Sequence, residues 1–368
     1  MLSFVRAKEV VAACCLGVLG LGGAYFYGIT PPHSFAPPES AQGLLERADI
    51  LAWGNRWAEA KPLFERASRG FTQQGELSKA LYATVSEIPV DETVSAPVTI
   101  QLLTNDLKKP EAQNPETRLR ILNVLGLVET NYNAALALPT WQEVQRLALE
   151  RGHLMLASRS QGEQGIATYI LGDKATGAKL TIRAWTLAKA EHDTAATVRY
   201  AGLYGAGKVD MQEYSKALKP LDEALRLAQE TPSVAYPTIA VDAKIEALAG
   251  LHRYDEALQL SNLALQRLQG TLFDGEKTEV YLDRAEIERG QGNLLAAAAD
   301  CERSLAISRR IVYYRGIANA AGRLAVTYEQ ANRLPEALAA INDAIEANTH
   351  IPLAVSYTHL TLPTKRIV

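Results

Sequence analysis

One segment of the chain has the residue spacing of a phosphate-binding loop. Gly202 to Val209 reads GLYGAGKV, which fits the pattern G-x-x-x-x-G-K, and TIAVD at residues 238–242 could pass for the acidic strand that follows in such enzymes. These loops need Ser or Thr after the lysine, because that hydroxyl binds Mg²⁺. This chain has Val209 at that position. We therefore predict that the segment is not a nucleotide site.

No other group of residues has the spacing of a catalytic or metal-binding site. Of the three cysteines, Cys14 and Cys15 lie in an apolar run and Cys301 stands alone, which indicates neither a disulfide framework nor a four-ligand metal site. No two of the six histidines are spaced to put both rings on one helix face. We expect a non-enzymatic protein without catalytic residues, metal ligands, cofactor or small-molecule substrate.

Composition and charge favour a helical protein that does not bind nucleic acid. The chain has 368 residues and a formal net charge of −3, and it contains no basic run of five or more residues. Binding driven by phosphate contacts is therefore not expected. Alanine and leucine dominate, and alternation of β-branched residues is rare. This composition predicts helix.

The amino end has the pattern of a membrane anchor. Val10 to Ile29 is a run of 20 residues without a charge, and a helix of that length spans about 30 Å, the thickness of a bilayer core. Arg6 and Lys8 precede the run, whereas the first basic residue after it is Arg47. Basic residues favour the cytoplasmic side. We predict that residues 1–29 form an uncleaved, single-pass signal anchor, with a cytoplasmic amino terminus and the following residues exported to the periplasmic or extracytoplasmic side.

Two other interpretations of the amino end are open. Gly22 and Ala24 form a small-x-small site, so a cleaved signal peptide would leave a secreted or periplasmic protein beginning near Ala24. A lipoprotein would use Cys14, although only four apolar residues precede it in the run and the run continues past it. The proline-rich residues 30–40 are predicted to form a stiff spacer between the membrane and the next domain.

The carboxyl end differs in composition from the rest of the chain. Val355 to Val368 reads VSYTHLTLPTKRIV, which is rich in threonine and β-formers and has no helical face. Its first residues resemble a translation of the transposon-end adaptor used in shotgun sequencing libraries. We interpret residues 355–368 as a non-native, adaptor-derived tail, with a genuine short tail as the alternative. The natural gene is then expected to continue beyond this fragment.

The middle of the chain repeats every forty residues. The segments MQEYSKALKPLDEAL, HRYDEALQLSNLAL and NRLPEALAAINDAI each place a small residue three positions after a bulky one, and a second small residue seven positions later. Small residues seven apart lie on one helix face, where an antiparallel neighbour can approach closely. The residues predicted to pack within this repeat are Trp57, Ala60, Ala137, Gly177, Tyr214, Ala217, Tyr254, Ala257, Ala264, Ala297, Ala337 and Ala344.

This pattern resembles the tetratricopeptide repeat family, in which such a motif opens the second helix of each hairpin. The resemblance covers Ser40 to Ala354 and implies an all-α, right-handed solenoid of antiparallel hairpins over residues 41–354. The period is forty rather than the family's usual 34, and the first-helix signature is poorly kept, so a related longer helical repeat is the alternative. The frame places GLYGAGKV inside a first helix. The forty-residue pattern is weak between Glu76 and Pro115. There we expect a loop or broken helix at Ser86–Val98 and helix from Thr99.

The resemblance also implies a function. Stacked hairpins form a superhelix whose concave face is lined by the first helices, and such proteins bind a protein or peptide there. The carboxyl-terminal half of this face is mostly acidic, so we expect a ligand with Lys or Arg. The alternative is that the array is the sensing part of a larger enzyme, a CHAT-type peptidase or a sensor histidine kinase, whose catalytic domain is missing from this fragment. The candidate contacts are Arg159, Tyr169, Arg199, Asp242, Glu246, Glu286, Arg289, Asn319 and Glu329.

Overall fold

The structure is a computed structural model that describes residues 39–90, 95–269 and 274–350. Within these ranges the chain is all-α and contains no strand, which confirms the all-α part of the predicted fold. No helix of the described part is both long and apolar enough to cross a bilayer. The predicted anchor at Val10–Ile29 and the predicted adaptor-derived tail at Val355–Val368 lie outside the described residues.

Sixteen α-helices and two short 3₁₀ helices make up the described chain. The amino-terminal part contains α1 (Ala41–Trp53), α2 (Trp57–Gln74), α3 (Leu77–Val85), η1 (Ile88–Val90), α4 (Ala96–Asp106) and η2 (Pro110–Gln113). The hairpins that follow are α5 (Pro115–Tyr132) and α6 (Ala134–Glu150), α7 (Leu154–Ile170) and α8 (Lys174–Ala190), α9 (Thr194–Asp210) and α10 (Tyr214–Glu230), α11 (Thr238–Gly250) and α12 (Tyr254–Leu268), α13 (Asp274–Gly290) and α14 (Leu294–Arg310), and α15 (Tyr314–Gln330) and α16 (Leu334–Thr349).

The predicted frame coincides with the second helix of each hairpin. The helices α10, α12, α14 and α16 begin at positions 214, 254, 294 and 334, forty residues apart. The small residue of the motif is the fourth residue of each helix, and it is buried in all of them. Burial at this position lets the first helix of the same hairpin pack closely. These residues are Ala217, Ala257, Ala297 and Ala337, and Ala60, Ala137 and Gly177 are the buried fourth residues of α2, α6 and α8.

Most of the short turns between helices contain one residue in the left-handed conformation. Its φ lies between 56° and 102° in the turns that follow α6 to α9, α11 and α13 to α15. A single left-handed residue reverses the chain tightly, so consecutive helices become antiparallel neighbours. The residues in these turns are Gly152, Gly172, His192, Gln212, His252, Gly292, Val312 and Asn332, and Asn55 and Gly75 adopt the same conformation after α1 and α2.

Several helices start at a polar residue that caps the helix. The side chains of Ser40, Asn114, Asn133, Asp173 and Asp193 each accept a hydrogen bond from a backbone N–H in the first turn of the helix that follows. Such caps satisfy donors that have no partner within the helix, and each contributes about 1 kcal/mol to stability.

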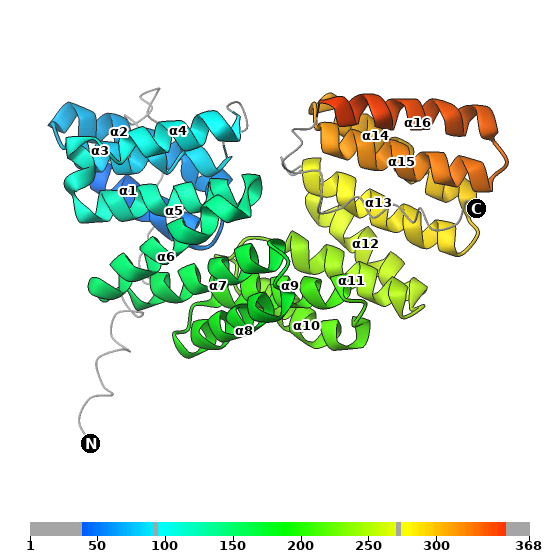
Figure 1. The fold of residues 1–368 in the computed structure, drawn as a ribbon, viewed down its shortest axis with the longest axis horizontal. Helices are drawn as coiled ribbons and strands as arrows, with labels where there is room; N and C mark the ends of the chain where they lie inside the picture. Colours follow the sequence, from blue (N-terminus) through cyan, green and yellow to red (C-terminus); the bar gives the residue numbers. More distant parts are fainter. Residues whose placement is uncertain (1–38, 91–94, 270–273, 351–368) are drawn as a thin grey trace, which may run out of the picture. The chain divides into compact units, whose positions relative to one another are not determined.

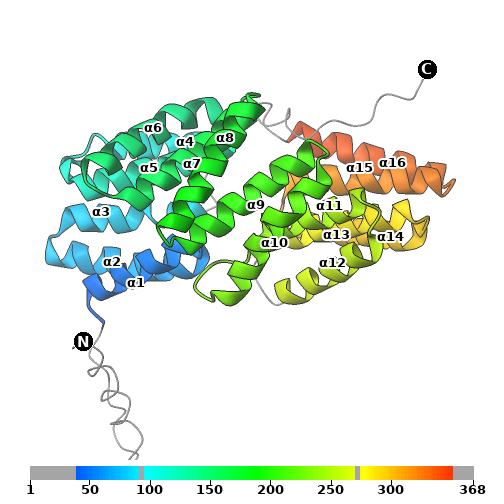
Figure 2. The ribbon, with the colours of Figure 1, turned by 90° about the horizontal axis from the view of Figure 1, so that it is seen from below.

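The hairpins stack side by side along the array (Figures 1 and 2). Within each hairpin the two helices pack together, and contacts between neighbouring hairpins also join consecutive first helices, such as α9 with α11 and α13 with α15. The first helices therefore form an inner layer, and the second helices lie outside it. The buried residues form a chain of hydrophobic clusters, one after another along the repeats.

The segment that resembled a phosphate loop lies within α9, as the frame predicted. A helix cannot wrap its backbone N–H groups around a phosphate in mid-segment, so the nucleotide interpretation is excluded. Gly205 serves packing instead: a Cβ at this residue would lie 2.5 Å from the side chain of Leu221 on α10. In the region where the frame fades, α4 begins at Ala96 rather than at Thr99, because Pro97 fits the first turn of a helix.

Candidate functional site

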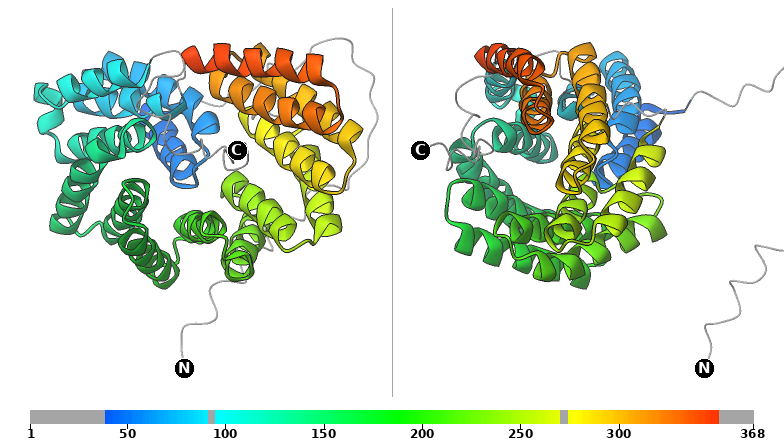
Figure 3. Two further views of the ribbon diagram at one scale, coloured as in Figure 1. Left: turned by 45° about the vertical axis from the view of Figure 1, so that its right-hand side comes forward. Right: turned by 90° about the vertical axis from the view of Figure 1, so that its right-hand side faces the viewer.

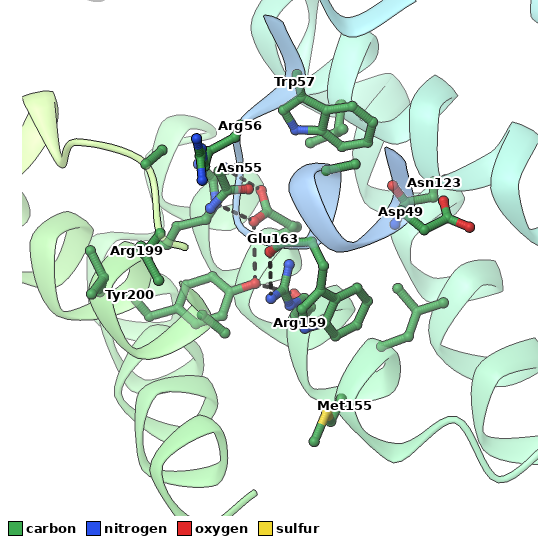
Figure 4. Close-up of a pocket in the computed structure, with 18 of the residues that line it drawn as sticks. Asp49, Asn55, Arg56, Trp57, Asn123, Met155, Arg159, Glu163, Arg199 and Tyr200 are labelled. Carbon is green, nitrogen blue, oxygen red and sulfur yellow. Dashed lines mark hydrogen bonds and ion pairs between the residues drawn. The ribbon is translucent and has the colours of Figure 1, made fainter. Parts of the chain in front are cut away.

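A cavity of about 1260 Å³ lies between the α1–α2 hairpin and the inner helices. Its walls come from α1, α2, α5, α7, α9 and the segment that joins α10 to α11 (Figure 4). Aromatic and apolar side chains such as Trp53, Trp57, Leu127 and Met155 line it together with charged groups. A cavity of this size and mixed lining can accept several side chains of a ligand.

The corner between α1 and α2 contacts residues far along the chain. Arg159 on α7 donates from Nη2 to the carbonyl of Trp53 at 2.9 Å, and its guanidinium carbon lies 3.6 Å from the centroid of the Trp53 ring. The backbone N–H of Ala235, in the loop between α10 and α11, donates to the carbonyl of Gly54 at 2.8 Å. These contacts close one side of the cavity.

Two paired arginines form part of the cavity wall (Figure 4). Arg159 donates from Nε and Nη2 to the two oxygens of Asp193, both at 2.7 Å. Arg199 donates to the oxygens of Glu163 at 2.7 and 2.9 Å. The Tyr200 hydroxyl donates to the carbonyl of Arg159 at 2.7 Å, and burial raises the pKa of Tyr200. Both guanidinium groups are thus bound by carboxylates, so they brace the wall rather than attract an anion.

A third arginine is held on the opposite wall. Arg120 on α5 forms an ion pair with Asp49 and a hydrogen bond with the Tyr82 hydroxyl, which in turn donates to Asp49 at 3.0 Å. Its guanidinium carbon lies 4.5 Å from the centroid of the Tyr82 ring. Burial raises the pKa of Tyr82 to about 12. The charges on this wall are neutralised within the protein, so the cavity itself presents mainly aromatic and apolar surface.

A group of carboxyl side chains lies farther along the inner layer. We call Asp242 on α11, with Glu276, Glu279 and Asp283 on α13, the acidic patch. Burial raises the pKa of Asp242, and the charges of the other three carboxylates raise it further. Burial also raises the pKa of Asp283 to about 8, although the Arg323 guanidinium, 4.0 Å away, lowers it. The buried Oδ1 of Asp242 has no hydrogen-bond partner. Glu276 also lines the cavity, so the patch borders it.

The predicted contact residues separate into distinct environments. Arg159 and Arg199 line the cavity, but each is bound by a carboxylate. Asp242 belongs to the acidic patch, and the charges of Glu246 and Glu286 raise the pKa of Asp283 in that patch. The structure therefore brings Asp242, Glu246 and Glu286 of α11 and α13 together, whereas Arg159 and Arg199 lie on the preceding first helices α7 and α9.

The remaining predicted contacts lie outside the cavity lining and the patch. Tyr169 donates from its hydroxyl to Asp210 at 2.7 Å, which joins α7 to the end of α9. Arg289 forms an ion pair with Glu286 one helical turn away. On α15, Asn319 is half-buried and Glu329 is exposed.

Several residues of the site were not among the predicted contacts. These residues are Trp53, Glu163, Glu279 and Asp283. Only Glu163 could have been found from the sequence. Glu163 and Arg199 are 36 residues apart, close to one repeat, and carry opposite charges on consecutive first helices. A search for opposite charges at that separation would have found the pair. Within the described ranges no three His, Cys, Asp or Glu side chains are grouped to hold a metal ion.

One comparison with known proteins agrees with the repeat. Residues 276–349 match the tetratricopeptide repeat family, so the predicted resemblance is confirmed there. No match is found among the curated proteins. The solved structures that align with the chain include the following two. The apo form of RapI has 14% identity over 74% of this chain and 98% of its own, with a TM-score of 0.49. Aspartyl phosphate phosphatase F from Bacillus subtilis has 12% identity over 90% of this chain and 98% of its own, also with a TM-score of 0.49.

Proposed function

We propose that this protein is a non-catalytic helical-repeat scaffold that binds a segment of a partner protein along its inner helices. The cavity takes apolar or aromatic side chains of that segment, and the acidic patch takes a Lys or Arg side chain. The observation that carries the proposal is the acidic patch itself, where four carboxyl groups lie together, Glu276 among them lines the cavity, and the buried Oδ1 of Asp242 has no partner.

The chemistry of the patch favours a cationic ligand. Burying like charges together is unfavourable, which is why the carboxyls of Asp242 and Asp283 hold protons more tightly than usual. A Lys or Arg side chain placed among them would offset the repulsion and donate charge-assisted hydrogen bonds. Two arginines oppose part of the negative charge: Arg323 lies 4.0 Å from Asp283 and is half-exposed, and Arg315 lowers the pKa of Glu279.

Binding to an arrayed library of peptides that differ in net charge and aromatic content tests the proposal. We expect retention of peptides that combine a Lys or Arg with an apolar or aromatic residue. The double variant Asp242→Asn with Asp283→Asn should bind them at least tenfold more weakly, a loss of about 1.4 kcal/mol. The matched control is Asp255→Asn on the exposed surface of α12, which should bind as the wild type does.

The same peptides supply a pH test. A bound cation stabilises the ionised carboxylates, so affinity should rise as the pH increases toward about 8, the pKa of Asp283. Fluorescence anisotropy with one labelled peptide at pH 6 and pH 8 measures this change. Preference for acidic peptides, or binding that is equal in the wild type and the double variant, would show that the patch is not the site.

We also propose that the scaffold is held at a membrane and exported. The support is the uncharged run at Val10–Ile29 and the basic residues before it. Detergent phase partitioning of the full chain and of a chain without residues 1–30 tests this. The full chain should enter the detergent phase and the shortened one the aqueous phase, whereas equal partitioning of the two would refute the anchor.

A further inference from the structure

The indole of Trp53 lies against a guanidinium group at the wall of the cavity. The curved array brings the end of α1, blue in Figure 3, against the inner helix α7. There the guanidinium carbon of Arg159 lies 3.6 Å from the centroid of the Trp53 ring, so the guanidinium covers one face of the indole. Trp53 is nevertheless 38% exposed, and it lines the cavity. Its exposed part is therefore the other face and the edge of the ring.

The group that holds the Trp53 ring is itself fixed. Arg159 donates from Nη2 to the Trp53 carbonyl at 2.9 Å, and its guanidinium also donates to both oxygens of Asp193. The side chains of Arg159 and Asp193 are only 15% and 2% exposed. An indole that packs on a largely buried ion pair loses little conformational entropy when a ligand binds to it. Such preorganised aromatic residues are effective binding anchors.

A second exposed apolar side chain lies on the same wall. Met155 is four residues before Arg159 on α7, so the two residues share one face of the helix. Met155 is 40% exposed and lines the cavity, below Arg159 in Figure 4. A thioether adapts its shape to its neighbours and packs favourably against aromatic rings. We call Trp53 and Met155 together the Trp53 platform.

The cation on one face of the indole decides which group suits the exposed face. Arg159 draws the π-electron density of the ring toward itself, so the opposite face is less negative and attracts a second cation only weakly. An aromatic ring can stack on such a face, and an electron-rich phenol or indole does so best. An aliphatic side chain gains only from the burial of its surface. The platform thus favours an aromatic group over a cation or an aliphatic chain.

We infer that the Trp53 platform binds an aromatic side chain of the ligand segment. The inference rests on the proposed function, and it names the residue type that enters the cavity while a Lys or Arg of the same segment reaches the acidic patch. An aromatic pair strengthens binding about twofold to tenfold beyond the effect of buried area. Trp53 is then the residue that makes the cavity select tyrosine, tryptophan or phenylalanine over leucine.

Fluorine NMR of the full chain labelled with 5-fluorotryptophan tests the platform without a peptide. The resonance of Trp53 is the one that is missing from the spectrum of Trp53→Phe. Titration with 4-methylphenol should shift it, and 4-methylcyclohexanol, a saturated ring of similar size, should bind about fivefold more weakly. Methylguanidinium should leave it in place. The internal control is the resonance of Trp185 on α8, which lies outside the cavity lining and should not move.

Two results of this titration overturn the inference. One is equal affinity for the phenol and the cyclohexanol, which would show that the wall accepts any apolar group. The other is a Trp53 resonance that 4-methylphenol does not move, or that moves only together with Trp185. A response to methylguanidinium as strong as that to 4-methylphenol would show a cation site instead, and it also overturns the inference.

A double-mutant cycle places the aromatic side chain of a bound peptide. A peptide that the wild type retains is compared with a counterpart that has leucine in place of its aromatic residue. The exchange should weaken binding to the wild type about fivefold and should make no difference in Trp53→Leu. Tyr314→Leu on α15 is the matched control, because Tyr314 is also exposed, by 36%, but lies outside the cavity lining. That variant should distinguish the two peptides as the wild type does.

The inference and the proposed function can fail separately. The fragment is uncharged, so 4-methylphenol should bind the double variant Asp242→Asn with Asp283→Asn as it binds the wild type. If peptides bind through the acidic patch but the leucine counterpart binds the wild type equally well, the inference is wrong and the proposed function stands. If no peptide binds while 4-methylphenol still shifts the Trp53 resonance and binds more tightly than the cyclohexanol, the platform stands and the proposed function is wrong.

Discussion

Val312 adopts a backbone conformation that suits glycine better than a β-branched residue. Its φ is 56°, and its side chain is 61% exposed in the turn between α14 and α15. A left-handed conformation costs a residue with a Cβ about 1–2 kcal/mol. The left-handed residues of the neighbouring turns, twenty positions later and twenty positions earlier, are Asn332 and Gly292, both better suited to this conformation.

Val312→Gly should therefore raise the free energy of unfolding by about 0.5–1 kcal/mol, since relief of strain exceeds the entropy cost of glycine. Urea unfolding followed by circular dichroism measures the change. The control is Val326→Gly within α15, where glycine should instead cost about 1 kcal/mol. Destabilisation by Val312→Gly would mean that the turn is not strained.

Asp283 predicts a pH dependence of stability. Burial raises the pKa of Asp283 in the folded protein to about 8, whereas an unfolded aspartate titrates near about 3.9. Between these values the folded state holds a proton that the unfolded state has lost, so stability falls as the pH rises from about 4 to about 8. Asp283→Asn should remove this fall and stabilise the protein by about 1 kcal/mol or more at pH 8, with little effect at pH 4.

Denaturant unfolding at pH 4, 6 and 8 checks this, with Asp255→Asn as the control. Asp255 is exposed, so its replacement should change stability by less than about 0.5 kcal/mol at each pH. Equal pH profiles for the wild type and Asp283→Asn would show that the carboxyl of Asp283 is not the cause.

At the scale of the elements, the forty-residue repeat correctly predicted where the second helices begin. The start of each second helix is marked by a short local sequence pattern. The small residue at the fourth position is read from sequence, and its burial follows from close helix packing. The frame could not locate α11, which begins at Thr238 rather than near position 234. The loop before α11 contacts the α1–α2 corner, through the hydrogen bond from the Ala235 N–H to the Gly54 carbonyl. A pattern that repeats every forty residues cannot predict a contact between residues so far apart in the sequence.

The candidate site was only partly predictable for a related reason. The pattern selects residues that face inward, and it does not say which charges are already paired. Arg159 and Arg199 face the cavity as candidate contacts, yet Asp193 and Glu163 bind them from neighbouring first helices. Asp242 and Asp283 on α11 and α13 have raised pKa values because they are buried close to other carboxyls, and this environment appears only in three dimensions.

The close-packing role of the frame gives an element-scale prediction. Ala257 is fully buried where α12 meets α11, so Ala257→Leu should overpack this contact and lower the free energy of unfolding by about 1–3 kcal/mol. Ala296→Leu on α14 places the same side chain at an exposed position and should change stability by less than about 0.5 kcal/mol. Chemical denaturation of both variants measures the difference. Unchanged stability in Ala257→Leu would contradict the packing role.

At the scale of the whole array, the α1–α2 corner joins the amino-terminal hairpin to the middle of the chain. Gly54 makes this possible, because a Cβ there would lie 2.1 Å from the carbonyl oxygen of Ser233. The backbone cannot yield at so short a distance without losing the hydrogen bond from the Ala235 N–H to the Gly54 carbonyl, which is 2.8 Å long. Closure of the cavity on this side therefore depends on the absence of one methyl group.

Gly54→Ala should separate the corner from the loop between α10 and α11 while each hairpin stays folded. Hydrogen exchange at the amide of Ala235 should become faster, and the free energy of unfolding should fall by about 1–3 kcal/mol. Gly322→Ala is the matched control, because a Cβ at Gly322 on α15 meets no atom within 4 Å and alanine favours helix. Exchange at Ala235 should be unchanged in that variant. Equal protection of the Ala235 amide in Gly54→Ala and the wild type would show that the corner does not hold the loop. The stacking of Arg159 on Trp53 would then be the contact that closes this side of the cavity.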